Sequence, residues 1–375
     1  MATKRSVRIV DHLGGLTDPR RRKVVYPLVN IVTIAICAVL CGADDFVSIA
    51  AFGRKKQWWL ETFLDLSAGI PSHDRFNAVL AVLKPAEFEA CLLSWIGALQ
   101  EALPGQIVAI DGKTLRRSFD AASGKSAIHL VSAWATANRL SLGQVAVDQK
   151  SNEITAIPKL LKLLELSGCW VTIDAMGCQT EIAQGIVDAG ADYVLAVKQN
   201  QKNLYNDVSW FFLTKLAENF AGVRVRRHTT REKGHGRQET REYYVCAVPA
   251  ELRNRQRWPR LAAIGCVVSH VVRNGKTCCQ RRYYILSRKL AAKEFAAAVR
   301  GHWSIENQLH WQLDVSFGED QSRIRLGHAD QNFSTLRRTA LALLKNNQGL
   351  KCGVKNKRLA AGWNDDYLLE VLLGK

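Results

Sequence analysis

The sequence has no C-x-x-C pair and comparatively few acidic residues, and each of these features excludes some classes of protein. Ten cysteines are scattered along 375 residues without a C-x-x-C pair, which argues against a structural zinc site or a disulfide framework and fits reduced thiols in a cytoplasm. Acidic residues are few, with 34 Asp and Glu against 52 Lys and Arg, so the net charge is +18. A surface this basic attracts polyanions. We therefore expect nucleic acid as the partner, with an anionic membrane surface or a merely basic protein as alternatives.

The sequence also lacks a convincing membrane span. Its long apolar stretch, Val24 to Gly42, approaches the roughly 17 to 25 residues that a span requires. It contains Pro27, Asn30 and Thr33, and it begins too far from the N-terminus, behind a polar leader, to be a signal peptide. We therefore predict a buried helix here and no membrane partner. The chain shows no internal repeat and no low-complexity segment.

Residues 1–100 have the pattern of an all-α domain. The stretch "AVLAVLKPAEFEACLLSWIGAL" places apolar residues three and four apart, as an amphipathic helix does. Ser72 precedes this run and is predicted to cap a helix. The basic segment "FGRKKQWW" gives the domain an edge that either contacts DNA or is simply solvated.

Residues 101–199 change to the patterns of strands. The runs "IVAID", "WVTID" and "DYVLAVK" are typical of short buried strands, and "AIHLVSAWATANRLSLGQVAV" predicts a hairpin that turns at Asn138 and Arg139. Helices separate these strands, one of them from about Thr155 with Pro158 in its first turn. The alternation predicts an α/β fold, a mixed sheet with helices on its faces.

Residues 200–282 interrupt this alternation with a basic, β-rich insertion. One predicted hairpin turns at the Asn-Gly of "VVRNGKTCC". In "HGRQETREYY", His235, Arg237 and Arg241 line one side of another hairpin, where they either run along phosphates or are simply solvated. Trp258, among arginines, either stacks on an unpaired base or packs in the ordinary way.

Two aspartates occupy equivalent places at the ends of apolar strands. Asp111 ends "IVAID" and Asp174 ends "WVTID". Ligand sites of α/β sheets lie at the carboxyl ends of strands, and a carboxylate is costly to bury there without a cation. If the two strands are neighbours, the carboxylates converge on a site that suits Mg²⁺. The alternative for each residue is an ordinary turn or helix-capping aspartate.

A third acid is expected in the helices that end the chain. The stretch "HWSIENQLHWQLDVSFGED" contains four acids, Glu306, Asp314, Glu319 and Asp320. Glu306 lies within the helical run, with a histidine one turn away on each side, so its position favours it. Three carboxylates would complete a two-metal site for phosphodiester hydrolysis or transesterification.

The histidines and tryptophans of this stretch are interpreted differently from its acids. A zinc peptidase has the pattern H-E-x-x-H, whereas His302 and His310 are eight residues apart, so that class is excluded. The two histidines are predicted to lie beside Glu306 on its helix face. Trp303 and Trp311 fall off the polar stripe, and we expect them to pack against the sheet.

Six motifs in order resemble the DDE transposases of bacterial insertion sequences, in the group of the H-repeat-associated proteins. The motifs are "AIDGKTLRRS", "KSNEITAIP", "VTIDAMGCQTEIAQ", "GADYVLAVKQNQ", "HGRQETR" and "HWSIENQLHWQLDVSFGEDQSRIR". The resemblance covers about Leu13 to Asn347. It implies a ribonuclease-H-like catalytic domain in residues 101–199 and 283–375, interrupted by the β-rich insertion of residues 200–282 and preceded by an N-terminal all-α, transposase-associated domain in residues 1–100.

The same resemblance implies a catalytic triad of Asp111, Asp174 and Glu306. These acids would use Mg²⁺, with Mn²⁺ as a substitute, to cut at transposon ends and join the 3′ hydroxyl to target DNA. Related transposases carry Tyr, Arg and Lys around the glutamate, and this chain departs from them with Val299, His302 and Leu313. The basic partner of the scissile phosphate must then come partly from elsewhere, with His302 as one candidate.

DNA contacts are predicted for polar and basic residues near the candidate acids and in the basic insertion. The residues predicted to contact DNA are Lys113, Lys198, Gln201, Lys202, His235, Arg237, Arg241, His302 and Arg323. The expected partners are terminal inverted repeats, target DNA and a second copy of the chain on paired ends, in the bacterial cytoplasm at the nucleoid. A metal-dependent nuclease of the same fold and a domesticated or inactive DNA-binding relative are the alternatives, although three intact acids argue against decay.

Overall fold

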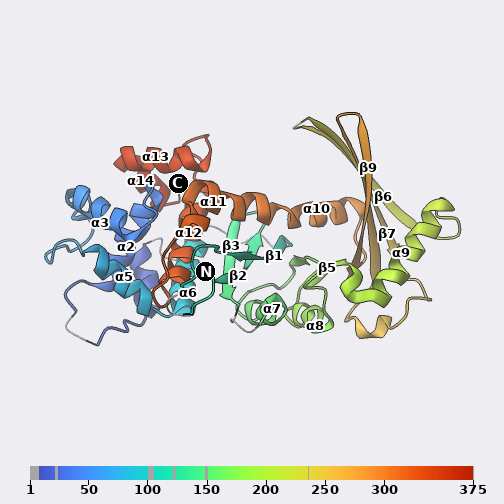
Figure 1. Ribbon diagram of the computed structural model, residues 1–375, viewed down its shortest axis with the longest axis horizontal. Helices are drawn as coiled ribbons and strands as arrows, with labels where there is room; N and C mark the ends of the chain where they lie inside the picture. The colour runs from blue at the N-terminus through green and yellow to red at the C-terminus, as the bar shows by residue number, and fades with distance from the viewer. Residues whose placement is uncertain are drawn as a thin grey trace, which may run out of the picture.

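The structure, a computed structural model, describes residues 8–21, 24–99, 105–120, 124–147, 151–234 and 236–374. A helical body occupies one end of the molecule, and a large sheet extends from its middle to the other end (Figure 1). Parallel and antiparallel pairs occur in the same sheet. The predicted α/β class with a mixed sheet is confirmed.

The N-terminal part of the helical body consists of short helices with local caps. They are α1 (Ile9–His12), η1 (Leu13–Gly15), α2 (Leu28–Leu40), α3 (Phe46–Lys55), α4 (Gln57–Leu60), α5 (His73–Val82) and α6 (Pro85–Leu99). The predicted cap Ser72 accepts a hydrogen bond from the backbone N–H of Arg75 at 3.3 Å. Asp45 caps α3 in the same way, because its carboxylate accepts from the backbone N–H of Ser48 at 2.8 Å.

Helix α2 is the apolar stretch that the sequence predicted as a buried helix, and that prediction is confirmed. It begins after Pro27, and every residue from Asn30 to Leu40 is buried. Much of its cover comes from α12 (Ala329–Asn346), which also contacts α5 and α6. The N-terminal and C-terminal helices therefore share one hydrophobic core. Within the ranges that the structure describes, no helix combines the length and apolarity needed to cross a bilayer.

The sheet has nine strands in the order β3-β2-β1-β4-β5-β9-β8-β7-β6. Strands β1, β4 and β5 are parallel, and the other neighbours pair antiparallel. Strand β4 is buried along its whole length, since helices cover both faces of a parallel core. Helices α7 and α8 lie on one side of it and α10 on the other (Figure 1). The strands are β1 (Ile107–Thr114), β2 (His129–Ala135), β3 (Leu140–Ala146), β4 (Trp170–Ile173), β5 (Asp192–Val197), β6 (Val225–Gly234), β7 (Arg237–Ala247), β8 (Ala263–Arg273) and β9 (Lys276–Leu286).

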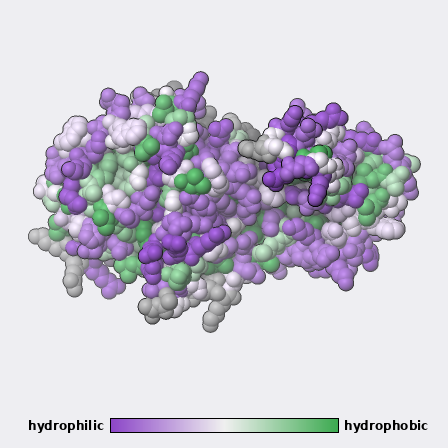
Figure 2. All heavy atoms as spheres, turned by 45° about the horizontal axis from the view of Figure 1, so that its top comes forward, coloured by the Kyte–Doolittle hydropathy of each residue, from purple (hydrophilic) through white to green (hydrophobic). Residues whose placement is uncertain are grey.

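The basic β-rich stretch continues this sheet. Strand β9 pairs antiparallel with β5, beginning at Val194 opposite Leu286. The β8–β9 turn has Asn274 at φ 49° and Gly275 at φ 73°, the left-handed values that favour Asn-Gly, so the predicted hairpin is confirmed. The far ends of these strands project from the surface as a hydrophilic group (Figure 2). The earlier hairpin, β2–β3, is also present, with Arg139 at φ 56° in its turn.

The remaining helices follow the predicted alternation with one difference. They are α7 (Glu153–Leu161), α8 (Thr180–Asp188), η2 (Gln199–Gln201), α9 (Lys202–Ala217), η3 (Arg255–Arg257), α10 (Ala292–His302), η4 (Glu306–His310), α11 (Trp311–Phe317), η5 (Glu319–Gln321), α13 (Val354–Trp363) and α14 (Asp365–Leu372). Helix α7 starts at Glu153, capped by Asn152, so Pro158 lies in its second turn and the predicted first-turn placement is wrong. The proline removes only one helical hydrogen bond there, and the buried face of α7 compensates for it.

Candidate active site

Asp111 and Asp174 occupy neighbouring places on parallel strands. The last paired residues of β1 and β4 are Ile110 and Ile173, and each aspartate follows directly. Strand β1 continues to Thr114 along β2, so Asp111 lies within the strand and not at its end as expected. The two strands are neighbours, as the prediction required, and both carboxylates line one cavity.

Glu306 reaches the same cavity from the opposite side. Helix α10 crosses the sheet above β1 and β4 (Figure 1), and Glu306 follows shortly after its last residue, His302. The cavity measures about 390 Å³, and Asp111, Asp174, Glu306 and His302 all line it. Three acids that are distant in the sequence therefore share one cavity because two strands and one helical run meet there.

The backbone at Glu306 is not the plain α-helix that its pattern predicted. Residues Glu306–His310 form a π-helical turn, in which the N–H of Trp311 donates to the carbonyl of Glu306. Such a turn contains one extra residue, which corresponds to about 100° of rotation around the helix axis. π-Turns often occur at functional sites, where they change the direction of side chains. Here Glu306 stays in the cavity while His310 faces Asp111.

Asp111 carries the clearest electrostatic signature of the site. Burial raises the pKa of Asp111 to about 7, and the negative charges of Glu153, Asp174 and Glu306 add to that rise. Carboxylates gathered in this way repel one another, and a bound cation would stabilise their charged form.

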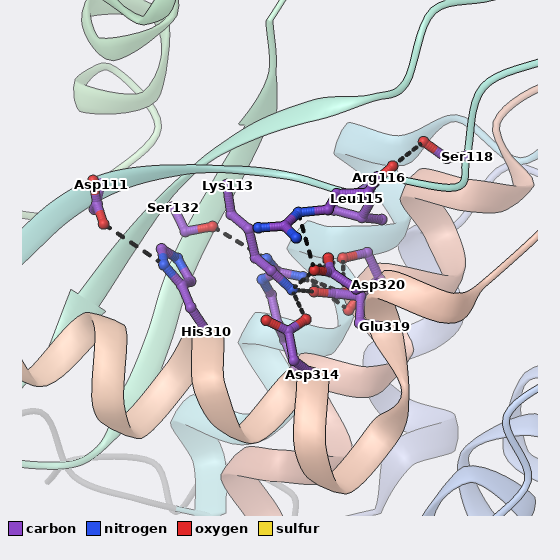
Figure 3. Close-up of polar contacts among 12 residues, drawn as sticks. Asp111, Lys113, Leu115, Arg116, Ser118, Ser132, His310, Asp314, Glu319 and Asp320 are labelled. Atoms are coloured by element: carbon purple, nitrogen blue, oxygen red, sulfur yellow. Dashed lines mark hydrogen bonds and ion pairs between the residues drawn. The ribbon is translucent and has the colours of Figure 1, made fainter.

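His310 stands beside Asp111 without supplying that cation. Its Nδ1 lies 3.6 Å from Asp111 Oδ2 (Figure 3). Burial lowers the pKa of His310 to about 3, so the ring is neutral at pH 7. Its Nε2 is buried and has no hydrogen-bond partner among the described residues. His310 therefore packs against Asp111 as an uncharged side chain.

The donor set of the cavity fits a hard divalent cation. Carboxylate oxygens are the ligands that Mg²⁺ prefers, and a cation would relieve the repulsion at Asp111. Asp174 is held in place because its Oδ1 accepts from the backbone N–H groups of Met176 at 3.0 Å and Gly177 at 3.3 Å. It therefore stabilises the turn that follows β4 and also lines the cavity. In the part of the chain that the structure describes, no three His, Cys, Asp or Glu side chains are already close enough to form a metal site.

Comparison with known proteins decides the family. Residues 102–344 match the family "Transposase DDE domain", and residues 10–96 match the family "DDE_Tnp_1-associated". This chain belongs to the DDE transposase family. It is 41% identical to the putative transposase YncI of Escherichia coli O157:H7, over 97% of this chain and 94% of that protein. It is 38% identical to the H repeat-associated putative transposase YhhI of Escherichia coli K12, over 98% of each chain. The resemblance to the H-repeat group is confirmed.

One solved structure, a piggyBac transposase synaptic complex with hairpin DNA, is distantly similar to this DDE-family chain. The two share 10% sequence identity and a TM-score of 0.42, over 94% of this chain and 75% of the other.

Among the predicted DNA contacts of this DDE-family chain, Lys198 lies at the cavity. It follows β5, is exposed, and lines the same cavity as the acids. Lys202 is exposed at the start of α9. Gln201 is engaged within the protein, because its Nε2 donates to the carbonyl of Cys178 at 3.0 Å. This bond fixes the start of α9 to the segment that follows Asp174.

Lys113 belongs to a buried ionic cluster of the helical body. Its side chain is 8% exposed, and its Nζ contacts Asp314 and lies 2.9 Å from Glu319 and 3.6 Å from Asp320 (Figure 3). Three carboxylates surround this ammonium, so its position does not favour the predicted phosphate contact. It lies two residues after Asp111 on strand β1, so both side chains are on the same face of the sheet.

The predicted hairpin arginines differ in accessibility. Arg241 is buried between Glu239 at 2.6 Å and Glu232 at 3.0 Å, so its position does not favour a DNA contact either. Arg237 is exposed, with Glu239 at 3.7 Å, and remains open to a phosphate. His235 lies outside the described residues.

Two other predicted residues lie away from the cavity. Arg323 is exposed and lines a separate surface pocket with Asp44 and Asp45. Trp258 is buried in the core beneath the sheet, so ordinary packing describes it and base stacking does not.

The aromatic residues around Glu306 correct one expectation. Trp303 is 36% exposed and Trp311 is 54% exposed, so the prediction that they pack against the sheet is wrong. The sheet-facing side of the helical run is filled by smaller buried side chains, including Ile305 and Leu309. His302 lines the cavity, and its Nδ1 lies 3.3 Å from Thr172 Oγ1. Burial lowers the pKa of His302, which favours the neutral form of its ring.

Sequence reasoning missed Glu153, which lines a separate pocket and whose charge raises the pKa of Asp111. Its Oε1 lies 2.8 Å from His129 Nε2, and His129 Nδ1 lies 2.7 Å from Thr114 Oγ1. A Cβ on Gly112 would come within 2.2 Å of that same Oε1, so the Glu153 side chain would have to move. The motif "KSNEITAIP" contains Glu153. An acidic residue in the first turn of a helix also stabilises that helix, so the motif alone did not assign Glu153 to the site.

Proposed function

We propose that this chain is a metal-dependent DNA transposase. It would cleave DNA at insertion-sequence ends and join the 3′ hydroxyl ends to target DNA. The observation that carries the proposal is the meeting of Asp111, Asp174 and Glu306 in one cavity of a chain that belongs to the DDE transposase family. The names of the relatives, which describe them as transposases, support it.

The three acids would hold Mg²⁺, or Mn²⁺ in its place. Two bound ions of this kind activate the attacking oxygen and stabilise the leaving oxygen of a phosphodiester. The chain itself positions the ligands: the amides of Met176 and Gly177 orient Asp174, and His310 backs Asp111. The π-turn directs Glu306 from the other wall. The cavity between the walls leaves room for a phosphodiester.

We further propose that the catalytic core is ribonuclease-H-like. The order β3-β2-β1-β4-β5, with β1, β4 and β5 parallel and β2 and β3 antiparallel, supports this fold. In this scheme residues 1–100 form the helical transposase-associated domain, residues 101–199 and 283–375 the catalytic domain, and residues 200–282 the insertion. The last boundary falls inside β9, which pairs with the core strand β5.

DNA binding by this protein should depend steeply on salt, with Lys198 and Lys202 contributing. Each phosphate that a lysine neutralises releases counterions, so we expect the slope of log K against log salt to fall by about 1 in Lys198→Gln and in Lys202→Gln. Lys162→Gln, an exposed lysine at the end of α7, should leave the slope unchanged. Fluorescence anisotropy between 50 and 200 mM salt, the range in which such contacts lose most affinity, measures this. A flat response in the wild type would reject phosphate contacts by these surfaces.

The partners would be terminal inverted repeats and target DNA. We propose that two copies of the chain act together on paired ends, in the bacterial cytoplasm at the nucleoid. Size-exclusion chromatography of the protein with and without end DNA tests the pairing, and an unchanged one-to-one complex would count against it.

A strand-transfer assay tests the proposed function. Purified protein, Mg²⁺ and a DNA fragment that carries the sequences bordering the gene should yield both cleaved ends and joined products. Cleavage without joining would indicate a nuclease of the same fold. Tight binding without cleavage, unchanged in Asp174→Ala, would indicate a binding-only relative.

A further inference from the structure

One wall of the acid cavity is basic. Strand β9 contributes Gln280, Arg281 and Arg282 to the lining, and β5 separates it from β4 in the same sheet. Arg282 is half-buried, and its guanidinium carbon lies 4.8 Å from the centre of the Trp303 ring. Its Nη2 also donates to Gln280 Oε1 at 3.1 Å. The guanidinium is therefore held against an aromatic plane at the edge of the cavity.

Arg282 forms no ion pair with any carboxylate in the described part of the chain, although three acids line the same cavity. Arg288 makes a useful contrast, because it stacks on Trp170 at 4.7 Å but also has Asp192 at 3.6 Å. A half-buried guanidinium without an anion retains much of its desolvation cost. The arrangement around Arg282 is complete only when an anion joins it.

The geometry of a stacked guanidinium indicates which anion fits. Stacking occupies the flat face of Arg282, and Nη2 donates to Gln280, so the remaining N–H groups of its edge can reach an anion. Those groups match the two oxygens of a phosphate and bind them as a fork. The acids that would bind metal line the same cavity, so a DNA phosphate placed in it meets both kinds of charge.

We propose that Arg282, oriented by Trp303, is a phosphate-binding residue of the active site and contacts the DNA backbone next to the bond that is cut. This inference rests on the proposed function, since it takes the acid cavity as the cleavage centre. It places the cationic contact on strand β9, outside the helical run that carries Glu306. It also gives a role to Trp303, a large aromatic side chain that is 36% exposed.

Neutralising single phosphates tests the contact directly. The probe is a duplex of the DNA that borders the gene, in which each phosphate around the cleaved bond is replaced in turn by a methylphosphonate. Dissociation constants are measured with Ca²⁺, which occupies oxygen-ligand sites. We expect one position to weaken wild-type binding about tenfold or more, since charge-assisted hydrogen bonds have this magnitude. Arg282→Gln should bind the unmodified duplex about that much more weakly and show no further loss at that position.

Matched variants separate this contact from a packing effect. Arg288→Gln removes an equivalent stacked arginine outside the cavity and should keep the wild-type pattern of phosphate sensitivity. Arg282→Lys should restore part of the loss, because it keeps the charge and loses the planar fork. Trp303→Leu keeps Arg282 but removes the ring on which it stacks. The loss of affinity caused by the methylphosphonate at the sensitive position should then lie between those of the wild type and Arg282→Gln.

The outcomes are distinguishable from those of the cleavage assay. If every methylphosphonate affects Arg282→Gln and the wild type equally, the proposal is overturned. If Arg282→Gln does not fold, as judged by its Tm, then Trp303→Leu decides, and a wild-type pattern there overturns the proposal. A wild-type protein that binds the duplex but never cleaves it would reject the proposed function, while the binding scan would still report the Arg282 contact.

Discussion

Asp174→Asn is expected to abolish metal-dependent DNA cleavage while leaving DNA binding intact. The substitution removes a negative charge that would hold metal, but it keeps the shape and the Oδ1 that accepts from Met176 and Gly177. Metal ions supply several kcal/mol of transition-state stabilisation, so the rate should fall by about a thousandfold or more. Single-turnover cleavage of end DNA measures the rate, and anisotropy in the same buffer measures binding.

Controls make this result specific to the acid cavity. Glu181→Gln removes an exposed carboxylate on α8 and should cleave like the wild type. Combining Asp174→Asn with Glu306→Gln should be no worse than either change alone, because residues that act as a unit are not additive. Calorimetric titration with Mn²⁺ should show weaker binding by Asp174→Asn, a readout independent of cleavage. Cleavage near the wild-type rate by Asp174→Asn would reject the triad.

Glu319→Gln is expected to destabilise the fold by about 3–5 kcal/mol. Glu319 is completely buried, and Lys113 Nζ lies 2.9 Å from its carboxylate (Figure 3). Arg338 Nη1 lies 3.2 Å from the same carboxylate. Removing its charge takes the carboxylate away from buried Arg338 and leaves Lys113 with Asp314 and Asp320 alone, which costs more than losing a surface pair. Urea unfolding followed by circular dichroism measures the change.

An exposed pair provides the control for that measurement. Glu218→Gln breaks the pair with Lys215 on the surface of α9 and should cost less than about 1 kcal/mol. If Glu319→Gln lowers the free energy of unfolding by less than about 1 kcal/mol as well, the buried cluster does not stabilise the helical body.

The same carboxylate predicts how stability depends on pH. Burial by itself raises the pKa of Glu319, but the charges of Arg338 and Lys113 outweigh it, so the folded-state pKa lies well below the ordinary value. A depressed carboxyl pKa contributes stability that is fully present above the unfolded pKa, about 4.3. That contribution is lost as pH falls below it, because the unfolded chain takes up the proton first. Wild type should therefore weaken more steeply than Glu319→Gln when unfolding is repeated below about pH 4.3.

Local sequence patterns predicted much of the fold and the main site. "IVAID" and "WVTID" are apolar enough to be strands buried on both faces, so their terminal aspartates were conspicuous. Asn274-Gly275 and the Ser72 cap depend only on neighbouring residues, which is why both were predicted correctly. In each case the physical cause acts within a few residues along the chain.

The incorrect expectations involve contacts between distant segments. Lys113 and Arg241 look like free cations in the sequence, yet their partners are carboxylates on other elements. Trp303 and Trp311 are large apolar residues typical of a core, but they lie on either side of the π-turn and are exposed, while Ile305 and Leu309 are buried. Neither effect can be derived from periodicity, because each depends on what packs against the element.

By itself, the sequence determined the basic charge, the apolar strands, the candidate acids and the family motifs, since composition and local periodicity carry that information. Only the tertiary structure decided that β1 and β4 are neighbours, that Glu306 lines the cavity of their aspartates from a π-turn, and that Arg282 lines that cavity too. The physical reason is that a cavity is made by side chains from several elements. Its charge balance is set by long-range packing, in which each group must find a partner or remain available for a ligand.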